Sequence, residues 1–244
     1  MKIEKAFILA AGLGTRMKPV TDSIPKPMVT VAGKSLLERT LDHLRAEGVR
    51  EIVINTHYRP DAIEACINTY RAAHKGLSIH LSHEPQLLDT GGGVINGLQH
   101  FSPDNASSEF FVLSGDGLWT DGAHEPALER LAEAWDPEAM DILMLLQPVS
   151  SFSLTEGVGD YDITQTGRAR RSKDRTGSHM FTSIRINSPS IFKNAPAGPF
   201  SYLKLLDDAE AKGRLYGLEH DGEWHHISTP ADLEAVDLAM RGKN

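Results

Sequence analysis

Short apolar runs alternate with longer segments of helical periodicity through the first half of the chain. The apolar runs at 6–11, 51–55, 77–82 and 110–114 have the length of strands that are buried on both faces. Between them the pattern predicts helices over 36–47, 61–73 and 91–100, the first opened by Ser35 and Glu38 in a capping-box pattern and ended by Gly48. This alternation predicts an α/β fold of Rossmann-like type, with a mostly parallel sheet and helices on both faces.

The second half of the chain departs from this alternation. Strands are predicted over 141–147 and 180–187, a hairpin over 161–169 that turns at Thr166-Gly167, and helices over 201–212 and 230–241. A hairpin pairs its strands antiparallel, so we expect the sheet to become mixed here. The sequence has no internal repeat, low-complexity tract or linker, and residues 1–244 are expected to form a single domain.

Composition limits the classes of partner. The chain has 244 residues, of which 40% are hydrophobic and 24% charged, so it can bury a sizeable core. A formal net charge of −8 argues against a general attraction to nucleic acid or anionic membranes. The lone Cys66 and the lack of a long apolar run predict a cytoplasmic protein, and the apolar stretch at 6–11 is too short for a signal peptide.

The end of the first strand carries the clearest candidate chemistry. It continues as Ala10-Ala11-Gly12-Leu13-Gly14-Thr15-Arg16. A Gly-x-Gly turn lets the backbone approach a ligand closely and leaves amides that point at anions. Arg16 adds a guanidinium fork, and Lys26 adds an ammonium between Pro25 and Pro27. The pattern predicts a polyphosphate site.

Two better-known phosphate motifs do not fit this segment. No Gly-Lys-Ser/Thr follows the glycines at P-loop spacing. The dinucleotide fingerprint would need glycine where Met17 stands.

Asp116 is a candidate metal ligand. It follows the apolar run 110–113 within Ser114-Gly115-Asp116-Gly117, which places a carboxylate at the carboxyl edge of the sheet. Ligands of such sheets bind at this edge, and a nucleotide there brings Mg²⁺ with it.

A second glycine-rich segment, Asp89-Thr90-Gly91-Gly92-Gly93, opens a predicted helix. Three consecutive glycines are unfavourable in a helix, by about 1 kcal/mol each. We therefore interpret this segment as a surface on which a base or sugar lies.

With these motifs the chain resembles sugar-1-phosphate nucleotidyltransferases, and most closely the small N-acetylmuramate 1-phosphate uridylyltransferases of cell-wall recycling. The resemblance covers nearly the whole chain and includes Leu9 to Met17, Pro25-Lys26-Pro27, Asp89 to Gly93, Leu113 to Asp116 and Trp224-His225-His226-Ile227-Ser228-Thr229. It implies the nucleotide-diphospho-sugar transferase fold, with a nucleotide-binding half over 1–120 and a sugar-binding half over 121–244.

The resemblance implies a reaction and a role for each matching residue. A sugar 1-phosphate attacks the α-phosphorus of an NTP, here UTP, to give an NDP-sugar and pyrophosphate. Arg16 is implied to stabilise the departing pyrophosphate, and Lys26 to bridge the α-phosphate and the incoming phosphate. The remaining roles are nucleotide binding by Ala10, Ala11, Gly12, Gly14, Thr15, Thr90 and Gly91, sugar binding by Gly159, Asp160 and Lys173, and Mg²⁺ binding by Asp116. Small-molecule substrates and a monomer or small homo-oligomer are expected, without nucleic acid or membrane partners.

Two residues depart from the family pattern. His226 stands where the family carries an aspartate that is its second metal ligand. Imidazole suits Mn²⁺, Co²⁺ or Zn²⁺ better than Mg²⁺, so three readings stay open: Mg²⁺ held by Asp116 and substrate phosphates alone, another metal, or a weakened relative. Ser183 replaces a glycine that is usual on the sugar side, which leaves the sugar's identity open.

Other functions share most of these features. A guanylyltransferase for mannose 1-phosphate or a heptose 1-phosphate would use the same phosphate machinery. A non-catalytic nucleotide-sugar binding protein would not need Arg16 or Lys26. The basic stretch from Arg168 to Arg175 is either a solvated face or a lid over an anionic sugar phosphate, and with N-acetylmuramate it would match the lactyl carboxylate.

Overall fold

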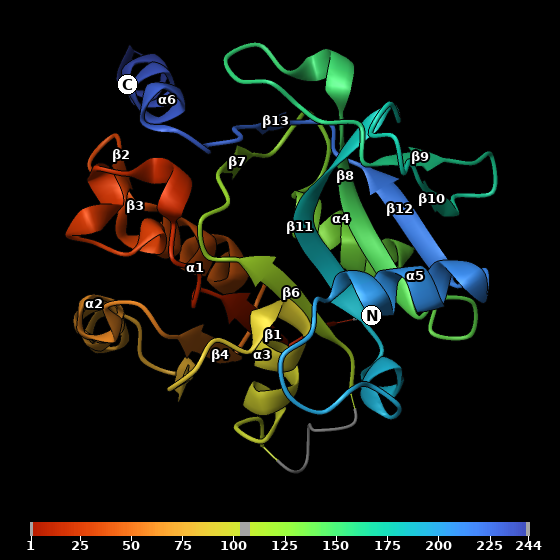
Figure 1. Cartoon of the computed structure of the whole chain (residues 1–244), viewed down its shortest axis with the longest axis horizontal. Coiled ribbons are helices and arrows are strands. Elements are labelled where there is room, and N and C mark those ends of the chain that lie inside the picture. The colour runs from red at the N-terminus through yellow and green to blue at the C-terminus, as the bar shows by residue number, and fades with distance from the viewer. Residues whose placement is uncertain (1, 103–107, 243–244) are drawn as a thin grey trace.

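A mixed sheet of nine strands occupies the centre of the part of the chain that the computed structural model describes, residues 2–102 and 108–242 (Figure 1). The main path of the sheet runs β10-β9-β11-β6-β1-β4-β5, and β8 and β12 extend it from β11. These strands are β1 (Lys5–Leu9), β4 (Glu51–Thr56), β5 (Ser78–His83), β6 (Phe110–Ser114), β8 (Ile142–Pro148), β9 (Tyr161–Ile163), β10 (Ala169–Arg171), β11 (His179–Asn187) and β12 (Leu215–Glu219). Two short pairs, β2 (Thr30–Val31) with β3 (Lys34–Ser35) and β7 (Trp119–Thr120) with β13 (Glu223–Trp224), lie outside it.

The parallel half of the sheet brings polar residues to one edge. Strand β1 pairs in parallel with β4 and with β6, and β4 pairs in parallel with β5. In this register Leu9 lies opposite Asn55 on one side and Ser114 on the other. Whatever follows Leu9 therefore enters a space flanked by two strand ends.

Strand β11 begins the antiparallel half. It pairs antiparallel with β6 and with β8, and its register on β8 shifts between Phe181 and Arg185. Within this irregularity Ser183 has a φ of 66°, a conformation that favours glycine. The mixed sheet expected from the sequence is confirmed.

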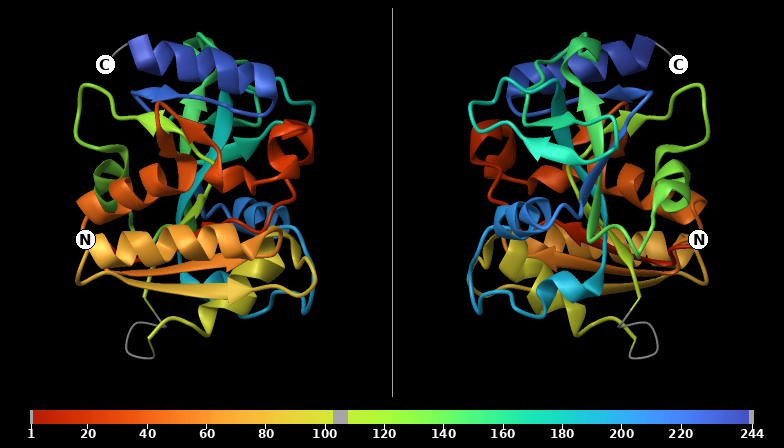
Figure 2. Two further views of the ribbon diagram at one scale, coloured as in Figure 1. Left: turned by 90° about the vertical axis from the view of Figure 1, so that its left-hand side faces the viewer. Right: turned by 90° about the vertical axis from the view of Figure 1, so that its right-hand side faces the viewer.

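Helices cover both faces of the sheet (Figure 2). Helices α1 (Leu36–Ala46), α2 (Pro60–Ala73) and α4 (Ala127–Ala134) pack on one face, and α3 (Asp89–Leu98) and α5 (Leu203–Ala211) on the other. Adjacent residues of β1 serve opposite faces, because Ile8 joins the core under α1 and Phe7 the core under α3. Among the described residues no helix has the length and apolar character needed to traverse a bilayer.

A third, smaller core holds the loop after β1. Met17 and Val29 pack with Val236 of the C-terminal helix α6 (Pro230–Gly242). The carboxylate of Asp237 in this helix accepts a 2.7 Å hydrogen bond from the amide of Ala32. The terminal helix thereby fixes the segment that carries Arg16.

The strands and helices predicted from the sequence are all present, with ends displaced by at most two residues. The pattern missed α4, β12 and the two-residue strands β2, β3, β7 and β13. Helix α4 has only eight residues and its N-terminus has no side-chain cap. The apolar pattern of β12 is interrupted by Gly217, where a Cβ would lie 2.6 Å from the Leu146 side chain.

Glu47 at the end of α1 makes stability depend on pH. Burial raises its pKa to about 7, and the carboxylates of Glu129 and Glu133 on α4 act in the same direction. The folded state therefore binds this proton more tightly than the unfolded chain, and stability falls as pH rises from about 4.5 through 7. Because solvent screens part of this effect, we expect Glu47→Gln to add about 1 kcal/mol at pH 8, a rise of about 2–4 °C in Tm. Thermal unfolding at pH 8 and pH 4.5 tests this, and an equal gain at both pH values would contradict it.

Candidate active site

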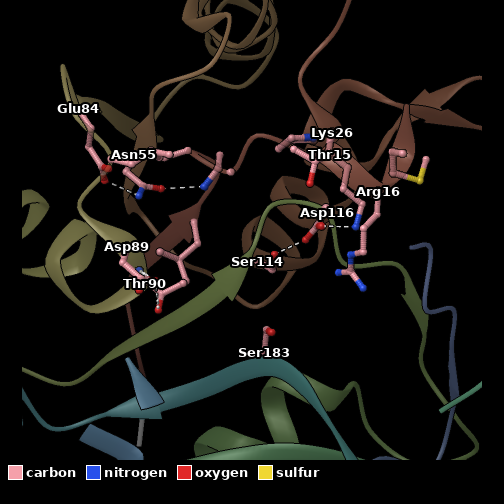
Figure 3. Close-up of a pocket in the computed structure, with 18 of the residues that line it drawn as sticks. Thr15, Arg16, Lys26, Asn55, Glu84, Asp89, Thr90, Ser114, Asp116 and Ser183 are labelled. Carbon is pink, nitrogen blue, oxygen red and sulfur yellow. Dashed lines mark hydrogen bonds and ion pairs between the residues drawn. The ribbon is translucent and has the colours of Figure 1, made fainter. Parts of the chain in front are cut away.

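A cavity of about 560 Å³ lies at the carboxyl ends of β1, β4 and β6 (Figure 3). Nine of the predicted site residues line it: Ala10, Ala11, Gly12, Gly14, Thr15, Arg16, Lys26, Thr90 and Asp116. In Figure 3, Thr15, Arg16, Lys26 and Asp116 gather on one side, and Asn55, Glu84, Asp89 and Thr90 on the other. The cavity thus has a charged end with two cations and a second end lined by polar groups.

Gly12 and Gly14 have different roles in the loop. Gly14 has a φ of 62°, and a Cβ there would lie 3.1 Å from Thr21 and 3.3 Å from the Cβ of Lys26. Its carbonyl accepts a 2.8 Å hydrogen bond from the Thr21 hydroxyl, which fixes the turn. Gly12 is exposed and has open space beside its Cα. Gly14 therefore shapes the loop, whereas Gly12 leaves room for a ligand.

A buried amide holds the loop from the neighbouring strand. Asn55 accepts a 2.7 Å hydrogen bond from the amide of Ala10 and donates one of 2.7 Å to Glu84. The second carboxylate oxygen of Glu84 accepts a bond from the amide of Leu88 at 3.0 Å. The sequence reading missed Asn55 and Glu84, although one lies at the end of a predicted strand and the other follows the next one, where polar residues of a parallel sheet meet.

Lys26 and Asp116 form an ion pair inside the cavity. The Lys26 Nζ lies 2.5 Å from an Asp116 carboxylate oxygen, and the two side chains are 15% and 26% exposed. The Ser114 hydroxyl donates to the other carboxylate oxygen. Burial alone would raise the pKa of the Asp116 carboxyl, but the Lys26 ammonium and the Ser114 hydrogen bond outweigh it, and the pKa lies below its usual value. Asp116 is therefore an anion at neutral pH.

This donor set fits a metal that is shared with a substrate. Among the described residues no cluster of three or more histidine, cysteine or carboxylate side chains is placed to hold an ion. Mg²⁺ in nucleotide sites uses one or two carboxylates together with phosphate oxygens and water. The Asp116 carboxylate meets that requirement once phosphates occupy the cavity.

His226 lies close enough to Lys26 and Arg16 for their charges to affect the pKa of its imidazole. Burial lowers the pKa of its imidazole, and the positive charges of Lys26 and Arg16 lower it further. The ring is therefore neutral at pH 7 and has a lone pair available. Its backbone amide is fixed by a 3.2 Å hydrogen bond to the Thr155 hydroxyl. His226 is not among the residues that line the cavity, although Ser228 is.

Close packing within the protein explains why residues 91–93 are glycines. A Cβ at Gly91 would overlap the ring of Phe200, and one at Gly92 would lie 2.5 Å from the carbonyl oxygen of Gly198. A Cβ at Gly93 would collide with the Asn55–Glu84 pair described above. The amide of Gly91 already donates to the Phe200 carbonyl at 2.9 Å. Packing therefore accounts for these glycines without a ligand, and of Thr90 and Gly91 only Thr90 lines the cavity.

A second cavity of about 430 Å³ adjoins the first and shares Leu9, Thr90 and Ser183 with it. Asp160 and Lys173 of the predicted sugar-side residues line it. Gly159 does not; it is buried where a Cβ would overlap the backbone of Gly177, so its small size serves strand packing. Of the basic stretch, Arg171, Lys173 and Arg175 line this cavity, whereas Arg168 and Arg170 do not.

Comparisons with known proteins agree with this geometry. Residues 5–153 match the family model for nucleotidyl transferases. The N-acetylmuramate alpha-1-phosphate uridylyltransferase of Caulobacter vibrioides is 35% identical, over 96% of this chain and 96% of that protein. The enzyme of the same name from Neisseria meningitidis is 31% identical, over 96% and 98% of the two chains. A crystal structure of UDP-glucose pyrophosphorylase complexed with UDP-glucose superposes with a TM-score of 0.80 at 17% identity, over 99% and 100% of the chains, and shows the same nucleotide-diphospho-sugar transferase fold.

Proposed function

Because the chain belongs to the nucleotidyl transferase family and is a sugar-1-phosphate nucleotidyltransferase, we propose that it joins UTP to N-acetylmuramate 1-phosphate. The products are UDP-N-acetylmuramate and pyrophosphate. The observation that carries this proposal is that the cavity at Lys26 and Asp116 shares Ser183 and Thr90 with a second, basic cavity. On this proposal the chain acts on cell-wall sugars.

The choice of sugar has two supports. Two relatives that match over nearly their whole length carry the name of this activity. N-acetylmuramate has a lactyl carboxylate that other N-acetylated hexosamines lack, and Arg171, Lys173 and Arg175 line the second cavity. Local cations are needed to attract such a group to a chain with a net charge of −8.

We assign the two halves of the chain to the two substrates. Exposed Gly12 and Thr15 receive the phosphates of the nucleotide, whose base and ribose lie toward Asn55, Glu84 and Thr90. The sugar occupies the second cavity, beside Asp160 and Lys173. The nucleotide thus meets residues before about 120, and the sugar meets residues after them.

The chemistry requires two anions to approach and a third to leave. An oxygen of the sugar phosphate forms a bond to the α-phosphorus, and the bond from that phosphorus to the bridging oxygen of the β-phosphate breaks, with its electron pair leaving on pyrophosphate. Lys26 neutralises charge shared by the incoming and α-phosphates, and Arg16 receives the charge that develops on pyrophosphate. No side chain needs to form a covalent intermediate.

Enzymes of this family generally use a divalent metal such as Mg²⁺. Asp116 would hold it, and the ion would supply neutralisation of charge on the phosphate oxygens. Because the carboxylate already pairs with Lys26 at 2.5 Å, the same residue organises both positive charges of the site.

Guanylyl transfer is the second candidate, and Glu84 favours it. A carboxylate only accepts hydrogen bonds, and guanine presents two adjacent N–H donors, on N1 and N2, where uracil presents one. Glu84 lines the end of the cavity opposite Lys26, and each of its oxygens, which already accept one bond from Asn55 or Leu88, has a second lone pair.

Pyrophosphate release from each of UTP, GTP, CTP and dTTP against a panel of sugar 1-phosphates separates these candidates. We expect the highest kcat/KM for UTP with N-acetylmuramate 1-phosphate. A preference for GTP with mannose 1-phosphate would replace this proposal by the guanylyl one. Each reaction is run with Mg²⁺ and with Mn²⁺, because the imidazole of His226 is a better ligand for Mn²⁺ than for Mg²⁺.

Replacement of His226 by aspartate tests the metal position. Aspartate supplies an oxygen ligand, and we expect His226→Asp to raise kcat/KM with Mg²⁺ by about tenfold and to reduce any advantage of Mn²⁺. His225→Asp is not a useful control, because His225 is buried; His226→Asn, which adds no charge, is the matched one. Equal rates for all three proteins in Mg²⁺ would show that this side chain does not meet the metal.

A further inference from the structure

Arg185 of β11 is a buried cation whose environment the nucleotidyl transfer reaction does not explain. It is 2% exposed, and its Nη1 donates to the carbonyl of Ser183 at 3.2 Å. Its guanidinium carbon lies 3.7 Å from the ring centre of Tyr202 and 5.7 Å from that of Phe181. Within the described part of the chain, its Nε and Nη2 have no partner at good hydrogen-bond geometry and no carboxylate forms an ion pair with it, and the neighbouring Tyr202 side chain is the group that favours its cation.

An unpaired buried charge is unfavourable, because desolvation is not balanced by an opposite charge. The contact with the Tyr202 ring offsets only part of this, since such contacts contribute about 2 kcal/mol when desolvated. Burial lowers the pKa of Arg185 below its ordinary value, although the guanidinium remains a cation. A bound anion would supply the partner that the fold does not.

The two unpartnered nitrogens have the geometry of a specific receptor. Nε and Nη2 carry the parallel N–H bonds along one edge of the guanidinium, and this edge matches both oxygens of a carboxylate. A second donor comes from another strand: Tyr161 of β9 lines the same cavity, is 3% exposed, and its hydroxyl also has no partner among the described residues. Protein atoms cover these groups, so a ligand must displace a neighbouring side chain of the cavity to reach them.

The other arginines of the second cavity are already engaged. Arg171 forms two 3.0 Å hydrogen bonds with the carboxylate of Asp207. Arg175 lies 3.8 Å from Asp160. Arg185 therefore differs from both in lacking a carboxylate among the residues described.

We propose that Arg185, assisted by the Tyr161 hydroxyl, binds a carboxylate on the sugar of the substrate and so selects carboxylate-bearing sugar 1-phosphates over neutral ones. This rests on the proposed function, because it takes the second cavity to be the sugar site. It makes Arg185 a specificity residue that acts on the sugar and not on the reacting phosphorus. The basic segment 171–175 then attracts the sugar, and the buried fork recognises it.

The test compares two sugars that differ only in the lactyl group, N-acetylmuramate 1-phosphate and N-acetylglucosamine 1-phosphate, with UTP. We expect Arg185→Met to lower kcat/KM about 100-fold for the first and to leave the second within about twofold. Arg170→Met is the matched control, since Arg170 is exposed and outside the cavity, and it should change neither. An equal loss for both sugars in Arg185→Met would reduce Arg185 to a structural role, and a wild type without preference would overturn the proposal.

Two further variants test the same proposal if Arg185→Met does not fold. Arg185→Lys keeps the charge and loses the fork, and Tyr161→Phe removes only the hydroxyl; each should lower kcat/KM selectively for the carboxylate-bearing sugar, by about tenfold. A uniform effect of both would contradict the proposal.

Calorimetric titration of N-acetylmuramate 1-phosphate separates this inference from the proposed reaction. If no nucleotide and sugar pair turns over, the proposed function fails, yet wild-type binding that is lost in Arg185→Met would still support the carboxylate site. If neutral sugars turn over without discrimination, the reaction class stands and the carboxylate site fails.

Discussion

Arg16→Ala should lower kcat for uridylyl transfer by about 10³-fold while leaving the fold intact. Arg16 lies in the exposed 3₁₀ turn Thr15–Met17 and lines the cavity, and its guanidinium has no hydrogen bond or ion pair among the described residues. Its loss therefore removes charge from the site without disturbing packing. The stabilisation of departing pyrophosphate that it would supply is about 3–4 kcal/mol, the size of one well-placed donor in other transfer reactions.

Lys18→Ala is the matched control for this change. Lys18 is two residues away, is also exposed, and pairs with Asp22 at 3.3 Å on the surface instead of lining the cavity. It should retain nearly the full rate. Steady-state pyrophosphate release with a thermal melt of each variant is the measurement, and an Arg16→Ala rate within about fivefold of wild type would remove Arg16 from the mechanism.

Lys26→Met should have the second largest effect, a loss of about 10²–10³-fold in kcat/KM. The methionine keeps the aliphatic volume but leaves the Asp116 carboxylate without the ammonium that lies 2.5 Å away. The pKa of Asp116 should then rise, because burial, which Lys26 now outweighs, is left to act with less opposition. The acid limb of the pH–rate profile should move to higher pH in the variant.

Asp116→Asn separates the two partners of this pair. If Lys26 acts only by holding Asp116, both variants and the double variant should lose the same factor in kcat/KM. If Lys26 also meets the phosphates, as proposed, the double variant should be slower than either single one. Wild-type kcat in Lys26→Met with a lowered Tm would contradict a role in the reaction.

The phosphate end of the site could be predicted because its signals are local. Gly12, Gly14 and Arg16 follow a buried strand directly, and Asp116 follows another, so chain order alone places them at one edge of a parallel sheet. The fold followed from the same alternation of strands and helices, except where short elements such as α4 gave a weak pattern.

The sequence could not show which residues, distant along the chain, become neighbours in the folded structure. Gly91 and Gly159 suggested ligand contacts, but the atoms that exclude a side chain come from Phe200 and Gly177, and no local pattern names them. Arg185 was missed for the opposite reason. Within the strand 180–187 a single charged residue resembles one on a solvated face, and its burial depends on Tyr202 at the start of α5.

Transfer of the α-phosphate is the central claim, and labelled UTP tests it most directly. The protein is incubated with N-acetylmuramate 1-phosphate, Mg²⁺ and UTP that carries ³²P at either the α or the γ position, and the products are separated. We predict that α label enters a UDP-sugar and γ label leaves as pyrophosphate, with both events lost in Arg16→Ala. Release of γ label as inorganic phosphate, or folded protein that binds UTP and moves neither label with any sugar 1-phosphate, would contradict this account.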